Sequence, residues 1–98
     1  MRLPRSCSLL RRMRDARLRR LGRLGPMLGG SLVKMPRHSS RYLTDTHRGK
    51  TRTMYIPLAR LEEVKQWNAT FKEAKTLLRE LSQIQRTLLR EEIAAGRR

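Results

Sequence analysis

The sequence is poor in the residues that build large cores and disulfide frameworks. Only four of its 98 residues are aromatic, and Cys7 is the single cysteine. One cysteine excludes an internal disulfide and favours a reducing compartment. The low aromatic content limits a chain of this length to one small domain of marginal stability. No stretch approaches the roughly 20 apolar residues that span a bilayer, so we expect a cytoplasmic protein without a membrane span.

Acidic residues are also scarce, because 8 Asp and Glu stand against 24 Lys and Arg, a formal net charge of +16. Residues 1–56 contain 15 of these cations but only two acids, Asp15 and Asp45. An excess of positive charge attracts polyanions, so the predicted partner is nucleic acid, DNA or RNA, bound mainly through its phosphates. The simpler alternative is a disordered basic arm with no single ligand.

The predicted phosphate contacts come from the arginine-rich N-terminal segment and from a hairpin further along the chain. Arginine side chains suit phosphate oxygens, and such contacts give affinity with little sequence preference. The predicted nucleic-acid-binding residues are Arg11, Arg12, Arg14, Arg17, Arg19, Arg20, Arg23, Arg48, Lys50 and Arg52.

The segment from Pro57 to Ala95 predicts one continuous helix, because it has no internal proline or glycine and is rich in strong helix formers. Pro57 suits the first helical position, and Gly96 suits a terminator. The apolar residues recur at heptad spacing, so they predict a packing face that needs a partner helix. That partner is either the N-terminal segment or a second copy of the chain, as a homodimer. The predicted helix-packing residues are Val64, Trp67, Phe71, Leu77, Leu78, Leu81, Ile84 and Leu88.

The N-terminal segment, Ser8 to Leu24, predicts a shorter helix that ends before Gly25 and Pro26. Arg17 falls on its apolar side, so the guanidinium must reach outward over buried methylenes, or else the segment is less ordered. The residues predicted on that side are Leu9, Leu10, Met13, Ala16, Leu21 and Leu24.

The middle of the chain predicts short strands. Ser31 to Met35 is one strand, closed by Pro36, and the two preceding glycines, Gly29 and Gly30, form a flexible joint. Arg41 to Thr44 and Thr51 to Ile56 are the arms of a hairpin, with Gly49 at a positive φ in its turn.

The predicted fold class is therefore α+β: an N-terminal helix, a β-hairpin or three-stranded antiparallel sheet, and a long amphipathic C-terminal helix. The predicted division is a basic arm over residues 1–28, then the sheet with the long helix over residues 29–98. Strands this short are unstable alone, so we expect the long helix to cover one face of them.

This middle region resembles a known family, on residues Gly30 to Lys34, Tyr42, Leu43, Gly49 to Arg52, Tyr55 to Pro57, Glu62 to Lys65 and Trp67. The family consists of short bacterial and archaeal proteins classed as a domain of unknown function. Its members often resemble products of mobile elements and are sometimes labelled transposase-like. The resemblance therefore implies an association with a mobile element.

The chain departs from that family between Lys34 and Tyr42. Typical members carry a longer loop there, with closely spaced cysteines of the kind that bind zinc. In this chain the loop has no cysteine and one histidine, His38. A closed tetrahedral zinc site cannot be built from these residues, so we expect neither a metal nor another cofactor.

No pattern typical of an enzyme is visible. His38 and His47 lack partners at a recognised catalytic or metal-binding spacing, and the only thiol lies near the N-terminus. Gly49, Lys50 and Thr51 resemble the end of a phosphate-binding loop, but Thr44 stands where that loop requires its first glycine.

The sequence predicts a non-catalytic nucleic-acid-binding accessory protein, and two alternatives stay open. One is an interaction module whose long helix pairs with a partner helix, the charge being only solubilising. The other is an organellar, ribosome-associated protein, because the start of the chain, Met1 to Leu24, is arginine-rich and almost free of acids, as mitochondrial transit peptides are.

Overall fold

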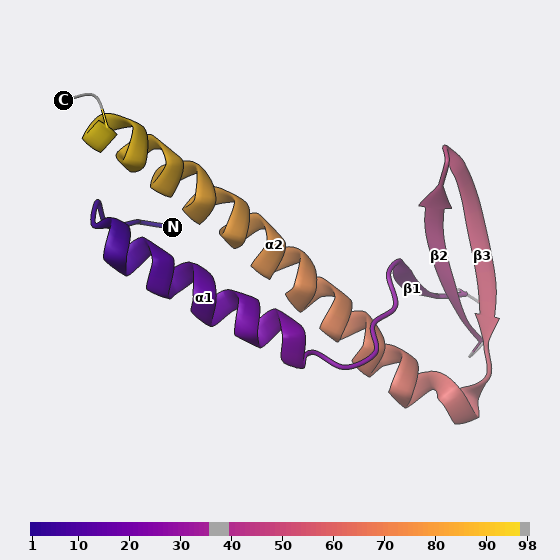
Figure 1. The fold of residues 1–98 in the computed structure, drawn as a ribbon. Helices are drawn as coiled ribbons and strands as arrows, with labels where there is room; N and C mark the ends of the chain where they lie inside the picture. The colour runs from indigo at the N-terminus through magenta and orange to yellow at the C-terminus, as the bar shows by residue number, and fades with distance from the viewer. Residues whose placement is uncertain (36–39, 97–98) are drawn as a thin grey trace. The chain divides into compact units, whose positions relative to one another are not determined.

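The computed structural model describes residues 1–35 and 40–96, and it confirms the α+β class. Helix α1 spans Cys7–Arg23 and helix α2 spans Leu61–Gly96 (Figure 1). Strands β1, β2 and β3 span Ser31–Lys34, Arg41–His47 and Lys50–Ile56, and a 3₁₀ turn, η1, spans Leu58–Arg60. Pro36 and His38, which the sequence assigns to a loop, lie outside the described residues.

The residues group into two compact units. The helical unit is Met1–Leu24 with Ala74–Arg98, and the sheet unit is Gly25–Glu73. Helix α2 contributes residues to both. The predicted division between residues 28 and 29 followed the order of the chain. The two units instead group residues that pack together, including residues far apart in the sequence.

Helix α1 begins one residue earlier than predicted because Ser6 caps it. The hydroxyl oxygen of Ser6 accepts a hydrogen bond from the backbone N–H of Leu9, at 3.3 Å. A serine in this position satisfies an amide that would otherwise lack a partner at the start of the helix. Arg20 and Arg23 occupy the last turn, where positive charge is favourable.

The core of the helical unit joins α1 to the second half of α2. Leu10, Ile84 and Leu88 are its fully buried side chains. The two segments are antiparallel, because Arg11 pairs with Glu92 whereas Arg17, further along α1, pairs with Glu80. Figure 1 shows α1 running beside this part of α2. The N-terminal segment is therefore the helix that covers the second half of the predicted packing face.

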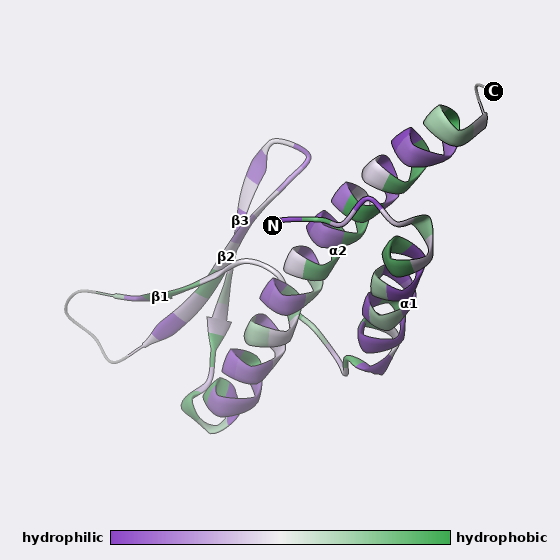
Figure 2. Cartoon of the chain, turned by 90° about the vertical axis from the view of Figure 1, so that its left-hand side faces the viewer, coloured by the Kyte–Doolittle hydropathy of each residue, from purple (hydrophilic) through white to green (hydrophobic). Residues whose placement is uncertain are grey.

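The buried stripe of α2 differs in detail from the heptad prediction. Leu77, Ile84 and Leu88 are buried and Leu81 is half-buried, whereas the Leu78 side chain is 55% exposed. Adjacent helical residues point about 100° apart, so only one of Leu77 and Leu78 can face α1. In both helices, hydrophobic and hydrophilic residues alternate along the turns (Figure 2).

Two of the residues predicted on the apolar side of α1 are also exposed. Leu9 is 46% exposed and Ala16 lies at the surface, whereas Met13, Leu21 and Leu24 are half-buried. With Leu10 at its centre, the packed side of this helix is narrower than the predicted one. It matches the width that a single neighbouring helix can cover.

The start of α2 corrects the prediction for Pro57. This proline has φ −58° and ψ 144°, an extended conformation, and it precedes η1 rather than opening the helix. Helix α2 begins at Leu61, and Gly96 is its last residue rather than a residue beyond its end. Glu62 and Glu63 lie in the first turn, where the helix dipole favours negative charge.

The sheet has the order β1-β2-β3, and both neighbouring pairs are antiparallel. The hairpin arms are longer than predicted because only two residues, Arg48 and Gly49, form the turn between His47 and Lys50. Their φ values, 51° and 78°, are both positive. Two-residue hairpin turns of this hand match the twist of the strands and keep them paired to the tip. The positive φ predicted for Gly49 is confirmed.

One face of the sheet packs on the first turns of α2. Leu43 and Ile56 from the strands form a buried cluster with Leu61 and Val64. Leu28, Leu32 and the half-buried Trp67 pack against this cluster. Phe71 is also half-buried.

A buried amide fixes the segment that enters β1. Asn68 on α2 is buried, and its Nδ2 donates hydrogen bonds to the carbonyl oxygens of Leu28 and Gly30, at 3.0 and 2.8 Å. The backbone N–H of Leu28 in turn donates to the Trp67 carbonyl oxygen, at 3.1 Å. These bonds satisfy backbone groups that would be costly to bury alone.

The segment predicted as a flexible joint is instead tightly packed. A β-carbon at Gly29 would lie 2.9 Å from the Phe71 ring, and one at Gly30 would lie 2.8 Å from the Thr44 carbonyl oxygen. Gly30 also has a φ of 111°, which side-chain-bearing residues rarely adopt. Close approach, rather than freedom of movement, explains the two glycines.

Replacing Leu10 with alanine is expected to lower the free energy of unfolding by about 2–5 kcal/mol, because it empties a fully buried site. The matched substitution at the neighbouring exposed residue, Leu9→Ala, is expected to change it by less than about 1 kcal/mol. Urea unfolding followed by circular dichroism measures both. Equal losses in the two variants would contradict the packing of α1 on α2.

Two glycine substitutions are expected to have opposite signs. Gly30→Ala should destabilise the chain by more than about 1 kcal/mol, because of its φ and the contact with Thr44. Gly22→Ala should stabilise it by about 0.5–1 kcal/mol, since Gly22 lies within α1 with open space around it. Thermal melts of the two variants give the comparison, and stabilisation by Gly30→Ala would refute the close approach.

Candidate nucleic-acid interface

The outer face of α1 carries three of the predicted phosphate-binding arginines. Arg12, Arg19 and Arg23 lie roughly opposite Leu10 at about 100° per residue, and all three are exposed. Over residues 1–35 and 40–96, no ion pair engages them. At about 1.5 Å per residue the row is about 16 Å long. Three guanidinium groups are therefore available to an external anion along one side of the helix, here called the arginine row.

Other predicted arginines of α1 are occupied within the chain. Arg11 Nη2 lies 2.9 Å from Glu92 Oε2, and Arg14 Nε lies 3.0 Å from Asp15 Oδ1. Arg20 also makes an interaction. An arginine already paired with a carboxylate gains less from a phosphate, because it must give up the existing partner.

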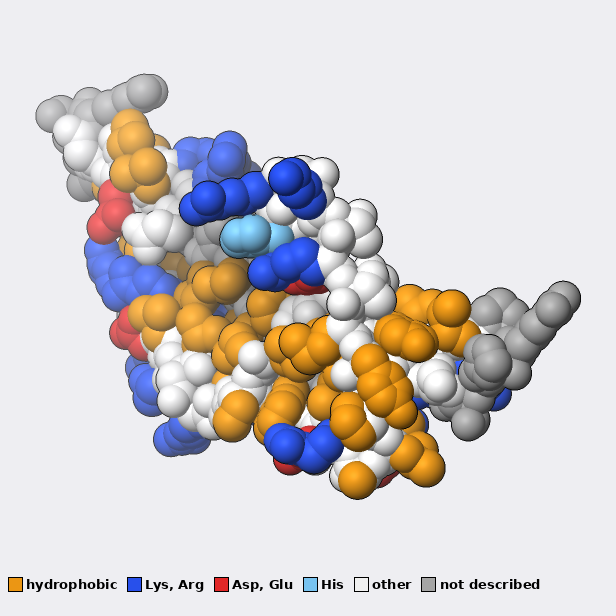
Figure 3. All heavy atoms as spheres, turned by 90° about the vertical axis from the view of Figure 1, so that its right-hand side faces the viewer, with side chains coloured by type: hydrophobic (Ala, Val, Ile, Leu, Met, Phe, Trp, Pro, Cys, Tyr) orange, Lys and Arg blue, Asp and Glu red, His pale blue; other side chains and the backbone are white. Residues whose placement is uncertain are grey.

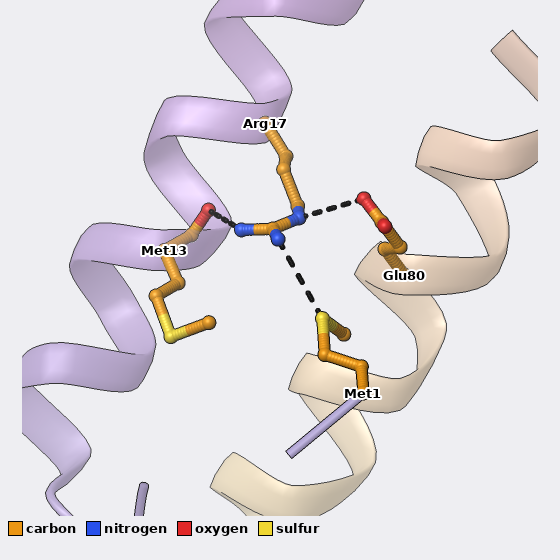
Figure 4. A network of polar contacts seen from close by, with 4 residues as sticks. All are labelled: Met1, Met13, Arg17 and Glu80. Carbon is orange, nitrogen blue, oxygen red and sulfur yellow. Dashed lines mark hydrogen bonds and ion pairs between the residues drawn. The ribbon is translucent and has the colours of Figure 1, made fainter. Parts of the chain in front are cut away.

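Arg17 makes its contacts within the chain, with residues of α1, α2 and the N-terminus (Figure 4). Its Nε donates to Glu80 Oε1 at 2.9 Å, and Nη1 donates to the Met13 carbonyl oxygen at 3.4 Å. Nη2 lies 3.5 Å from the sulfur of Met1. The side chain is only 24% exposed. The guanidinium thus joins α1 to α2, which explains how an arginine fits on the packed side.

The hairpin holds the remaining predicted cations. Arg52 and Asp45 are cross-strand partners, and Arg52 donates from Nε to Oδ1 at 3.1 Å and from Nη2 to Oδ2 at 2.7 Å. These hydrogen bonds lower the pKa of Asp45 below its ordinary value and raise the pKa of Arg52. Arg52 is consequently engaged by two parallel bonds.

Arg48 and Lys50, at and beside the turn, are exposed and make no ion pair with the described residues. In the space-filling view, the histidine (pale blue) lies among Lys and Arg side chains (Figure 3). The hairpin tip belongs to the sheet unit and the arginine row to the helical unit. Each of the two basic surfaces is therefore described within its own unit.

The sequence prediction missed two tyrosines on the sheet. Tyr42 on β2 and Tyr55 on β3 are cross-strand partners, and their ring centroids lie 5.7 Å apart. Both point to the face opposite Leu43, since side chains alternate along a strand. Their pairing could have been predicted from the sequence, because a two-residue turn at Arg48 and Gly49 places Tyr42 opposite Tyr55.

Two kinds of feature are absent from the residues that the structure describes. Residues 1–35 and 40–96 contain no group of three or more His, Cys, Asp or Glu side chains placed to hold a metal ion. Among the same residues, no helix has the length and apolar character needed to cross a bilayer.

Replacing Arg52 with glutamine is expected to raise the pKa of Asp45 toward its ordinary value of 3.8. Because the pKa of Asp45 is lowered in the folded state, the pair stabilises the hairpin fully at pH values above the ordinary pKa of 3.8. This stabilisation is lost as the pH falls through the lowered pKa. The pKa of Asp45 is measured by following the NMR chemical shift of its carboxyl carbon as a function of pH. Arg48→Gln, which removes the same charge from the turn, should leave the Asp45 pKa lowered.

Comparison with known proteins found no matching family model, no matching curated protein and no matching solved structure. The resemblance to the mobile-element-associated family therefore stays a prediction.

Proposed function

We propose that the chain is a non-catalytic accessory protein that binds nucleic acid through phosphate contacts from the arginine row. One observation carries the proposal: Arg12, Arg19 and Arg23 are exposed on one face of α1, and no carboxylate of the described residues pairs with them. The association with a mobile element comes from the family resemblance alone.

The dimensions of the row suit a phosphate backbone. A nucleic acid strand carries one charge per about 3.4 Å of helix axis, so a row of about 16 Å can meet several successive phosphates. Each contact releases condensed counterions, which supplies affinity at low salt. The net charge of +16 adds long-range attraction that raises the rate of encounter.

A second candidate function is helix-mediated association, which the exposed apolar residues of α2 favour. Leu78, Leu89 and Ile93 lie within about 60° of one another around the helix axis, and all three are exposed. Leu89 and Ile93 line a hollow of about 400 Å³ together with Arg86, Arg90 and Ala94. An apolar stripe on this side of α2, away from α1, suits a further helix.

The packing of α1 bears on the organellar alternative. Leu10 shares a buried cluster with Ile84 and Leu88. Cleavage near Leu24 would expose both of these α2 residues to water, at a cost of about 1.5–3 kcal/mol for each side chain. This favours a function in which α1 stays attached.

A variant with Arg12, Arg19 and Arg23 all changed to glutamine is expected to bind duplex DNA and RNA with a weaker salt dependence. Each lost phosphate contact reduces the slope of log affinity against log salt by about 0.9 for B-DNA, so the slope should fall by about 2.7. Fluorescence anisotropy between about 50 and 200 mM salt measures it.

The control changes Arg79, Arg86 and Arg90, on α2 of the same unit, to glutamine and removes the same charge. Its slope should change by less than about 1. Equal effects of the two variants would show that net charge rather than the row is responsible. Absence of binding by the unaltered chain at about 50 mM salt would refute the proposed function.

A further inference from the structure

The charged residues of the strands all lie on one face of the sheet. Side chains alternate along each strand, and the register places Leu32, Leu43 and Met54 on the face toward α2. The charged strand residues share the parity of that face: Lys34, Arg41, Asp45, Lys50 and Arg52. On the opposite face, the residues of the described strands are all uncharged: Ser31, Val33, Tyr42, Thr44, Thr46, Thr51, Thr53 and Tyr55. We call it the open face.

This open face is accessible, although charged residues make up 33% of the chain. Tyr55 is 53% exposed and Val33 is 41% exposed. A hollow of about 450 Å³ is lined by Val33, Met35, Tyr42, Thr44 and Thr53. An uncharged, partly aromatic surface of this kind in so charged a protein indicates a binding site.

We infer that the open face is a platform on which unpaired bases of single-stranded nucleic acid stack, with Tyr42 and Tyr55 as the stacking residues. The inference rests on the proposed function and names a form of nucleic acid and a second surface for it. The two rings come from neighbouring strands, with centroids 5.7 Å apart and planes at 58°. They offer π surfaces to two adjacent bases, as aromatic residues on open sheets do.

Single strands fit this surface better than duplexes. The bases of a duplex are stacked on one another, so their flat faces are not available to a tyrosine ring on a sheet. An unpaired base presents its flat face to the ring and its edge to the threonine hydroxyls, which both donate and accept hydrogen bonds. The open face offers four such threonines.

The charges around the sheet favour a polyanion over a protein partner. In the described part of the sheet unit, eight Lys and Arg stand against four Asp and Glu. Asp45 is the only acid on the strands, and Arg52 pairs with it. Arg48, in the turn at the hairpin tip, is exposed and lies outside the strands, so it suits a phosphate at that end of the open face. A second copy of the chain would bring another +16 to the same surface.

The closing experiment compares two oligonucleotides with the same phosphates. Anisotropy titrations use oligothymidine and an abasic oligomer of equal length, with the unaltered chain and with Tyr55→Thr and Tyr55→Phe. Threonine keeps the strand preference but removes the ring. We expect oligothymidine to bind the unaltered chain more tightly than the abasic oligomer does.

Tyr55→Thr should weaken the binding of oligothymidine by about 5-fold to about 150-fold and leave abasic binding unchanged. Tyr55→Phe should retain the affinity, because it keeps the ring. The salt dependence should be the same in all three proteins, since no phosphate contact is removed.

Several results would contradict the proposal that bases stack on the open face. Equal affinity for the two oligomers, or no effect of Tyr55→Thr, would do so while leaving phosphate binding by the arginine row intact. No binding of either oligomer by the unaltered chain at about 50 mM salt would instead refute the proposed function. A dimer by light scattering that Tyr55→Thr converts to a monomer would show that a second copy covers the open face.

A measurement on the unaltered chain guards against a variant that fails to fold. Photocrosslinking to an oligomer containing 5-iododeoxyuridine, followed by mass spectrometry, should place adducts on Tyr42 or Tyr55. Adducts confined to α1 would overturn the platform.

Discussion

The need to cover the apolar stripe of α2 determines the rest of the fold. A helix of 36 residues is about 54 Å long, and no single short element of this chain can cover it. The sheet covers Leu61 and Val64 near its start, and α1 covers Ile84 and Leu88 near its end. One helix therefore provides part of two separate cores. A chain with only four aromatic residues gains most of its burial from this shared use of leucine, isoleucine and valine.

Regular patterns allowed the sequence to predict most of the elements. The long run without proline or glycine predicted α2, and Gly49 predicted the turn of the hairpin. Details that depend on one local interaction were missed. The cap at Ser6 depends on a single hydrogen bond, and the extended ψ of Pro57 depends on how β3 leads into η1. The choice of Leu77 over Leu78 depends on where α1 lies, which no periodicity in α2 specifies.

The candidate sites were harder to predict, because a count of charges does not show which charges are paired. Arg11 and Glu92 are 81 residues apart in the sequence, and Arg17 and Glu80 are 63 residues apart. Only the packing of α1 on α2 brings them together. Arg12, Arg19 and Arg23 lie among the paired arginines in the sequence of α1, yet they are on the side of the helix that faces away from α2. The role of Asn68 could not be predicted either, because its hydrogen-bond partners are backbone carbonyl groups of a segment distant in the sequence.

Strand β3 lies at an edge of the sheet, and its position has a consequence for the behaviour of the protein at high concentration. The outer backbone groups of an edge strand are a template on which another copy can add, and repeated addition produces fibres. Here β3 begins with Lys50 and follows directly on Arg48. Two such edges brought together would oppose cations of the same sign, so the sheet is protected against extension from molecule to molecule.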